Sequence, residues 1–119
     1  MEMQTVRVTN TTKSTVLGSR IGVADTSWSR MVGLLGKAAL DSGGGLLIIP
    51  SQAVHTVAMR FPIDVVFLDR NCRVIHVHSA LAPYRITAPH WRARCVIELP
   101  VGVIAQTSTS VGDELLIED

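Results

Sequence analysis

The segment Ile63–Asp69, "IDVVFLD", is the feature that most constrains the fold of this chain. Successive side chains of a β-strand point to opposite faces, and here both faces are apolar apart from Asp64. A short apolar run of this kind is typical of a strand covered on both sides, so the chain must supply apolar material above and below it. Because an ionised carboxylate is expensive to bury without partners, we expect Asp64 to accept backbone hydrogen bonds or to pair with an arginine.

Short segments with alternating apolar residues, bounded by turn residues such as Gly, Pro, Asn and Asp, make up most of the rest of the chain. This pattern is typical of β-strands. Gly18 and Gly22 lie in the segment at residues 14–24, where they suggest β-bulges or a sharp bend. The expected strands lie at residues 4–10, 14–24, 46–50, 54–59, 63–69, 73–80, 93–100 and 113–118.

One segment has helical spacing instead. Its large apolar residues recur at i, i+3, i+4 and i+7, which is typical of an amphipathic helix: Trp28, Met31, Val32 and Leu35. We therefore predict a mostly β (β-rich α+β) fold, with one amphipathic helix near residues 26–36. Six to eight short strands would form a compact barrel-like or strongly coiled sheet, within a single domain over residues 1–119.

The composition argues against several classes of protein. Hydrophobic residues make up 47% and charged residues 18% of the chain, and the net charge is +1, which favours a buried core over disorder. The basic residues are scattered, so we expect no nucleic-acid partner. The richest basic stretch, Arg85–Arg94 ("RITAPHWRAR"), has the composition of a surface that stacks the bases of single-stranded nucleic acid, but we expect a solvated loop whose tryptophan packs down.

No apolar run is long enough for a membrane span and no signal peptide is visible, so we expect a soluble, cytoplasmic protein.

Cys72 and Cys95 lie 23 positions apart, without the spacing of a redox or metal-binding motif. We expect both to be small buried hydrophobic residues. A disulfide between them is an alternative in an oxidising compartment, and metal ligation is a third possibility.

The stretch "HTVAMRFPIDVVFLD", His55–Asp69, carries the candidate functional residues. A carboxylate that orients an imidazole creates a general base, so His55 as base and Asp64 as its orienter are the catalytic candidates if the chain is an enzyme. Arg30 on the expected helix and Glu98 in the apolar run "CVIELPVGV" place further charges beside hydrophobic residues. Since buried charges keep partners, Arg30, His55, Asp64 and Glu98 are the ligand-binding candidates.

His76 and His78 share one face of an expected strand, a spacing that can chelate one metal ion. Such a site needs a third protein ligand from another part of the chain. Two histidines at i and i+2 are also common on exposed strands without metal. We therefore expect no metal and no cofactor, and keep these two residues as candidate metal ligands.

The order of these motifs resembles the prokaryotic "domain of unknown function 192" family, from about residue 20 to the C-terminus. The resemblance rests on "RMVGLLGK", "GGGLLIIP", "HTVAMRFPIDVVFLD", Pro83, "IELPVG" and "VGD". Many family members carry a Trp–Met pair and a Thr before the aspartate segment, where this chain has "HTVAM" and "RFPID". The resemblance implies a compact β-rich fold and no established reaction, and several relatives are exported or membrane-anchored. It also places Arg30, His55, Asp64 and Glu98 at matching positions, where a shared pocket is expected.

Three functions are compatible with these residues. The leading hypothesis is a non-catalytic binding or accessory module for an unknown small molecule or protein, with a pocket lined by Arg30, the His55–Asp64 stretch and the Pro83–Trp91 loop. The alternative is a small hydrolytic or metal-dependent enzyme that uses His55 and Asp64. The third is a protein-interaction domain that pairs an exposed strand edge with a partner.

Overall fold

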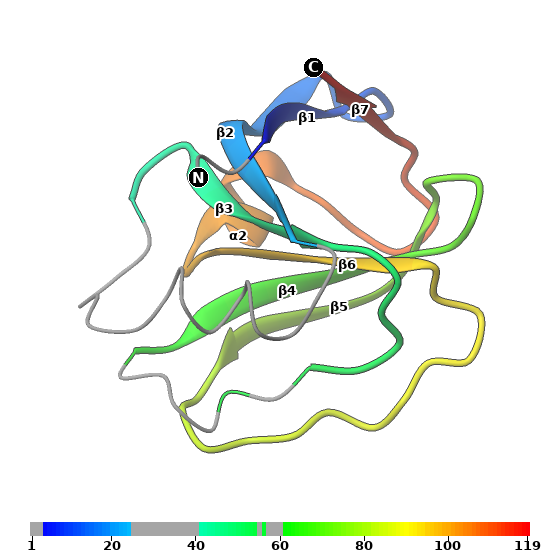
Figure 1. Cartoon of the computed structure of the whole chain (residues 1–119). Helices are drawn as coiled ribbons and strands as arrows, with labels where there is room; N and C mark the ends of the chain where they lie inside the picture. The colour runs from blue at the N-terminus through cyan, green and yellow to red at the C-terminus, as the bar shows by residue number, and fades with distance from the viewer. Residues whose placement is uncertain (1–3, 25–40, 55, 57–60) are drawn as a thin grey trace.

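A computed structural model describes residues 4–24, 41–54, 56 and 61–119 of the chain, and these residues form seven strands and a short helix (Figure 1). In chain order the elements are β1 (Thr5–Asn10), β2 (Thr15–Ala24), β3 (Gly44–Ile48), β4 (Ile63–Leu68), β5 (Val74–Leu81), β6 (Cys95–Pro100), α2 (Val103–Thr107) and β7 (Leu115–Glu118).

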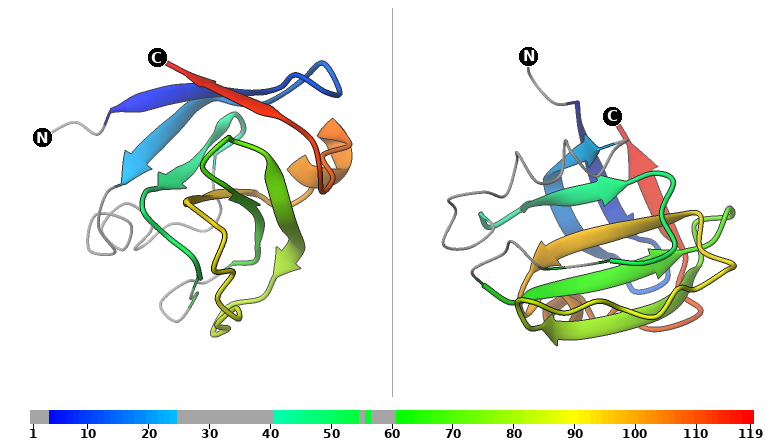
Figure 2. Two further views of the ribbon diagram at one scale, coloured as in Figure 1. Left: turned by 90° about the vertical axis from the view of Figure 1, so that its right-hand side faces the viewer. Right: turned by 60° about the horizontal axis from the view of Figure 1, so that its bottom comes forward.

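All seven strands belong to one sheet, in the order β5-β4-β6-β3-β2-β1-β7. β2 and β3 pair in parallel, and the other neighbours pair antiparallel. The sheet curls strongly, so that β1 and β7 fold back over the opposite end, as Figure 2 shows. The prediction of a mostly β fold with a strongly coiled sheet of six to eight strands is confirmed.

β4 is buried along its whole length, as its two apolar faces predict. On one face, inside the curl, Val66 and Leu68 pack in a cluster with residues of β1, β2, β6, β7 and α2. On the other face, Val65 and Phe67 pack in a second cluster that includes Val54 and Ala93 from outside the sheet. The segments 51–56 and 82–94 therefore supply the second cover that this strand requires.

Two glycines allow close approaches that the curl requires. A Cβ at Gly45, where φ is +152°, would lie 2.5 Å from the carbonyl oxygen of Glu98 on the neighbouring strand. A Cβ at Gly18 would lie 2.8 Å from the carbonyl oxygen of Gly43. The β1–β2 register also shifts next to Gly18, so the predicted irregularity in this strand is confirmed there.

The helical part of the prediction has a different outcome. The helix expected near residues 26–36 lies outside the described residues, and so does most of the strand expected at 54–59. Val54 and Thr56 are described, and they hydrogen bond to Thr87 and Arg85 without forming a regular strand. The helix that the structure describes, α2, was not predicted. Within the ranges described, no helix is long and apolar enough to cross a membrane.

Candidate functional site

Asp64 is completely buried, and its carboxylate accepts hydrogen bonds from three backbone amides. Ala80 N donates to Oδ1 at 2.9 Å, while Gly102 N and Ile104 N donate to Oδ2 at 3.1 and 2.9 Å. Gly102 and Ile104 are at the start of α2, which has no side-chain cap of its own. Asp64 therefore caps this helix from a distant strand, as an Asp at the N-cap position would do locally. The expectation that backbone amides satisfy Asp64 is confirmed.

Asp64 and Glu98, the two carboxylate candidates, lie on opposite faces of the sheet. Asp64 pairs in register with Leu99, and Glu98 pairs with Val65, so their side chains point to opposite sides. Glu98 is also completely buried, on the face that carries Val65. Arg30 and His55 lie outside the described residues, so a pocket that contains them stays a prediction.

An open groove of about 530 Å³ runs along β5, between this edge strand and the segment that follows it. We call it the histidine groove. Its lining residues come from β5 and from the following segment: His76, His78, Ala80, Leu81, Ala82, Arg85, Ile86, Thr87, Ala88 and His90. The expected pocket wall from the Pro83–Trp91 loop corresponds to part of this lining, whereas Asp64 and Glu98 do not line the groove.

Three aromatic rings pack together at one end of the groove. The imidazole rings of His76 and His90 stack with a centroid distance of 4.3 Å and an interplanar angle of 23°. The ring of Phe67 lies below, 4.5 Å from His90 and 5.5 Å from His76. Burial lowers the pKa of His76, and the neighbouring His90 and His78 lower this pKa further because a second positive charge is unfavourable there.

The imidazole stack also bears on metal binding. Ring-nitrogen lone pairs lie in the ring plane, so two nearly parallel rings direct their lone pairs side by side instead of toward one ion. Among the residues that the structure describes, no group of three or more His, Cys, Asp or Glu side chains is arranged to hold a metal ion. The candidate pair His76 and His78 therefore lines a groove, and no described third ligand completes a metal site.

The segment 82–94 is tied to the domain by backbone hydrogen bonds, although it has no regular strand. Thr87 N donates to Val54 O at 2.8 Å, and Arg94 N donates to Leu68 O at 2.7 Å. The expectation that its tryptophan packs down was wrong, because the side chain of Trp91 is 76% exposed. Ala93, two residues later, is the residue of this stretch that packs in the cluster around Phe67.

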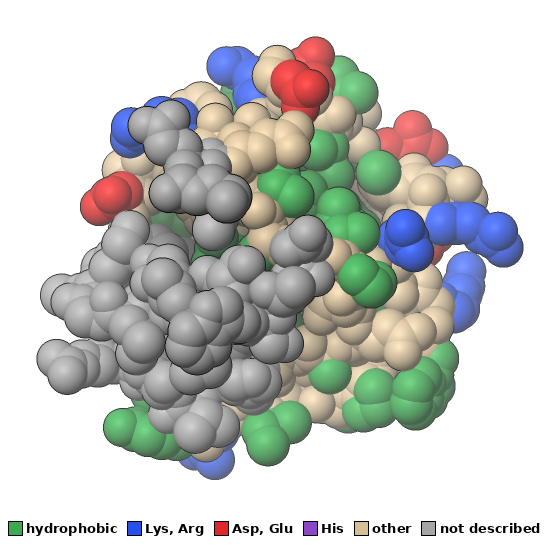
Figure 3. Space-filling view, in the orientation of Figure 1, with side chains coloured by type: hydrophobic (Ala, Val, Ile, Leu, Met, Phe, Trp, Pro, Cys, Tyr) green, Lys and Arg blue, Asp and Glu red, His purple; other side chains and the backbone are tan. Residues whose placement is uncertain are grey.

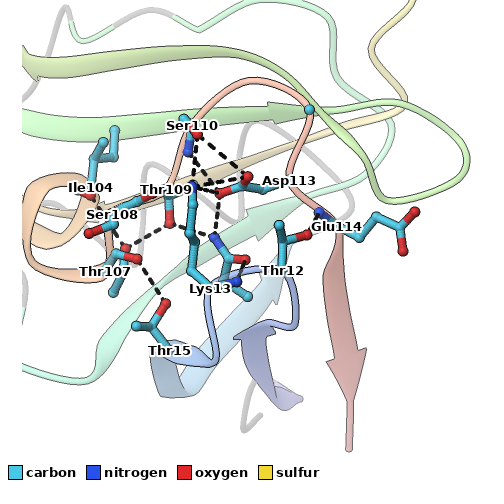
Figure 4. Close-up of polar contacts among 12 residues, drawn as sticks. Thr12, Lys13, Thr15, Ile104, Thr107, Ser108, Thr109, Ser110, Asp113 and Glu114 are labelled. Carbon is cyan, nitrogen blue, oxygen red and sulfur yellow. Dashed lines mark hydrogen bonds and ion pairs between the residues drawn. The ribbon is translucent and has the colours of Figure 1, made fainter.

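A buried polar cluster joins the β1–β2 turn to the chain before β7 (Figure 4). The carboxylate of Asp113 accepts hydrogen bonds from Asn10 Nδ2 at 2.9 Å, from Ser110 N at 3.0 Å and from Lys13 Nζ at 2.9 Å. Burial raises the pKa of Asp113, but the hydrogen bonds from Asn10, Lys13 and Ser110 and the charge of Lys13 outweigh it and lower the pKa to about 2. Sequence reasoning found Asp113 only as part of the "VGD" motif and missed its partners, because Asn10 is 103 positions away. The cluster holds the ends of the chain together.

The two cysteines are free thiols. Cys95 is buried, as expected, while Cys72 is half-buried in the turn before β5. Burial, and to a smaller degree the nearby Cys72, raise the pKa of Cys95 to about 12. A thiolate is the reactive form of cysteine, so Cys95 has the character of a core residue and not of a nucleophile.

A second cavity, of about 450 Å³, lies between β2 and α2. Its lining consists of apolar residues, Gly, Ser, Thr and Gln, with no ionisable side chain among the described residues that line it. It offers no acid, base or charge for chemistry, which leaves the histidine groove as the better candidate site.

Comparison with known proteins decides the family. Residues 7–117 match the DUF192 family, described as "Uncharacterized ACR". The chain belongs to this family. The DUF192 chain is 34% identical to a UPF0127 protein of Thermococcus sibiricus, over 89% of this chain and 71% of the relative. It is 32% identical to a UPF0127 protein of Pyrococcus horikoshii, over 91% and 96% of the two chains.

Two solved structures share the fold of this DUF192 chain. A protein of unknown function from Novosphingobium aromaticivorans has a TM-score of 0.75 and 23% identity, and the match covers 96% of this chain and 84% of the other. A putative transcription regulator from Sinorhizobium meliloti has a TM-score of 0.78 and 19% identity, over 98% and 96%. At this identity the likeness concerns the fold alone. The sequence relatives are archaeal and the two structures are bacterial, so the matches come from both groups of prokaryotes.

Proposed function

We propose that this DUF192 chain is a non-catalytic binding module, and that its ligand is a small anionic molecule held in the histidine groove. The observation that carries the proposal is the set of side chains around one opening: three imidazoles and the guanidinium of Arg85. The described lining contains no Asp or Glu. Imidazole N–H groups and a guanidinium are donors to carboxylate and phosphate oxygens, so an anion is the ligand that fits these side chains.

The size and the floor of the groove support the same conclusion. A volume of about 530 Å³ lies within the range of roughly 300–1,000 Å³ that small-molecule sites occupy. Leu81, Ile86 and three alanines give it an apolar surface beside the donors. A small molecule with an anionic head group and a short apolar or planar remainder matches both the donors and the apolar surface of the groove.

Asp64 supports the groove as a positioning residue. Its bond to Ala80 N holds the end of β5, where Ala80 has a φ of +54° and lines the groove with Leu81. A carboxylate that already accepts three amide hydrogen bonds is suited to fixing backbone. This role favours a binding module over an enzyme in which Asp64 orients a base.

Titration with small probes, followed by NMR, tests the proposal. We expect benzoate and phenyl phosphate to shift the backbone and ring signals of His76, His78, Arg85 and His90, and uncharged benzamide to shift them far less. Arg85→Gln should weaken phenyl phosphate binding at least about tenfold, because a charge-assisted hydrogen bond contributes about 1.5–3 kcal/mol. Arg70→Gln, a matched change at an exposed arginine of the β4–β5 turn, should leave binding unchanged. Equal shifts with benzamide, or shifts that fall outside the groove, would contradict the proposal.

A further inference from the structure

The segment 82–94 carries three large apolar side chains in solvent. Tyr84, Ile86 and Trp91 are 73%, 74% and 76% exposed, which is far more than the 46% of Leu116 on β7. The segment forms the lower edge of the molecule in Figure 1, on the side away from β1 and β7. Figure 3, in the same orientation, shows hydrophobic side chains along this edge. We call Tyr84, Ile86 and Trp91, with Arg92 and Arg94, the exposed edge.

The charged side chains within the segment 82–94 have one sign. No Asp or Glu occurs between Asp69 and Glu98, although the chain has ten acidic residues. The segment 82–94 itself holds three basic residues, Arg85, Arg92 and Arg94. Arg73, earlier in this stretch, is instead paired with Glu114 at 2.7 Å. Arg92 and Arg94 are exposed and flank the tryptophan closely in sequence. A partner that covers this edge is therefore anionic as well as apolar.

The segment is presented in a fixed shape. Five backbone hydrogen bonds join it to the described residues between 51 and 56, including Tyr84 N to Thr56 O at 2.9 Å and His90 N to Gln52 O at 2.8 Å. Gln52 Nε2 also donates to Trp91 O at 2.9 Å. Because the backbone is already ordered, docking costs little conformational entropy.

We infer that the exposed edge docks on the surface of an anionic lipid bilayer. Trp and Tyr are the residues that favour the membrane–water interface, since one part of each ring system is apolar and the other polar. An exposed Ile inserts into the acyl boundary, and arginines meet lipid phosphates, each contributing about 1 kcal/mol near an anionic surface. The side chains project singly from an irregular segment, whereas a protein interface centres on a packed apolar core. Ile86 also lines the histidine groove. Tyr84, Trp91 and the two arginines of the edge do not line it, so variants at these positions test the inference separately from the proposed ligand.

Vesicle co-sedimentation of the full chain tests the inference. We expect binding to vesicles of phosphatidylglycerol mixed with phosphatidylcholine, and at least about tenfold weaker binding to phosphatidylcholine alone. The Tyr84→Ala/Trp91→Ala variant should lose at least about tenfold in partitioning because two interfacial side chains are removed. The Arg92→Gln/Arg94→Gln variant should lose about 25-fold, since about 1 kcal/mol per arginine is about fivefold each. Leu116→Ala, an exposed apolar side chain at the opposite edge, should bind as the wild type does.

The variants change exposed side chains, so their melting temperatures should match the wild type and report that they fold. Binding to anionic vesicles that the paired alanine changes leave intact would overturn the inference. So would absence of binding to either vesicle, or equal binding to both. Tighter binding of a single-stranded oligothymidylate than of anionic vesicles would assign the edge to nucleic acid instead. Self-association of the wild type that Trp91→Ala abolishes would assign it to a contact between two copies, and also overturns the inference.

Discussion

The carboxylate of Asp64 on β4 accepts a hydrogen bond at 2.9 Å from the backbone amide of Ile104, which lies 40 positions later in the chain. Through Gly102 and Ala80 the same carboxylate also reaches the start of α2 and the end of β5. One buried side chain thus joins three elements of the fold. A helix of five residues is too short to be stable alone, so α2 depends on this cap and on its packing.

We predict that Asp64→Asn destabilises the protein by about 3 kcal/mol, because a buried amide donor left without an acceptor costs about 1–3 kcal/mol. Asparagine keeps one acceptor oxygen, but its NH₂ group would face a backbone N–H at the position of the lost oxygen. Urea unfolding measures the change in the free energy of unfolding. Asp41→Asn, the same change at an exposed position, should stay within about 0.5 kcal/mol of the wild type. A similarly small effect at Asp64 would show that the three hydrogen bonds do not support the fold.

Asp113 should make the protein sensitive to acid. Its pKa is lowered to about 2 from the usual 3.8, so the unfolded state binds a proton more readily than the folded state. The stabilisation is complete above about pH 5, is lost as the pH falls toward 2, and is on the order of 2 kcal/mol. Unfolding free energies measured between pH 6 and pH 2 should fall less steeply in Asp113→Asn than in the wild type. An equal slope in both proteins would contradict the prediction, and Asp41→Asn should retain the wild-type slope.

Gly45 and Gly112 form a matched pair for testing the close approach of β3 and β6. Both have positive φ, +152° and +97°, but only at Gly45 does an added Cβ meet a backbone atom, Glu98 O at 2.5 Å. At Gly112 nothing lies within 4 Å, so Gly112→Ala should cost only the strain of the left-handed region, about 1–2 kcal/mol. Gly45→Ala should cost more, about 3 kcal/mol or above, because the two strands must move apart. Thermal unfolding compares the two variants, and a smaller loss at Gly45 would refute the steric explanation.

The imidazole of His76 should titrate below its usual pKa of 6.5, because burial and the two neighbouring histidines disfavour its charged form. The unfolded state then takes up the proton first, so His76 lowers stability as the pH falls through the usual pKa. NMR titration of the ring protons measures this pKa directly. In His90→Ala, where the stacked ring is removed, the pKa of His76 should move upward. A His76 pKa at or above 6.5 in the wild type would be inconsistent with the packing around Phe67.

The order of apolar and polar residues along the chain was enough to predict the sheet and its buried central strand. In "IDVVFL" both faces of the strand carry apolar side chains, which predicts that β4 is covered on both sides. Every residue of β4 is buried. The cost of burying a carboxylate likewise predicted that Asp64 needs partners, either backbone amides or an arginine. Alternation succeeds because the faces of a strand follow from residue order alone.

The histidine groove and the exposed edge depend on contacts that residue order does not contain. His76 and His78 could be placed on one face from their spacing, but His90 stacks on His76 only because the segment 82–94 folds back along β5. Trp91 was expected to pack down, but it is exposed, and Ala93 two residues later is buried. The helix α2 escaped prediction because its cap comes from another strand.

The sequence by itself determined seven of the eight expected strands, the double cover of β4 and the need for partners around Asp64, because these follow from side-chain polarity and from a period of two residues. Only the tertiary structure decided which amides reach Asp64, which rings meet beside β5 and which apolar side chains stay in solvent. Those outcomes depend on how the curled sheet brings together residues that are far apart in the chain. The free energy of such contacts comes from packing and burial in three dimensions.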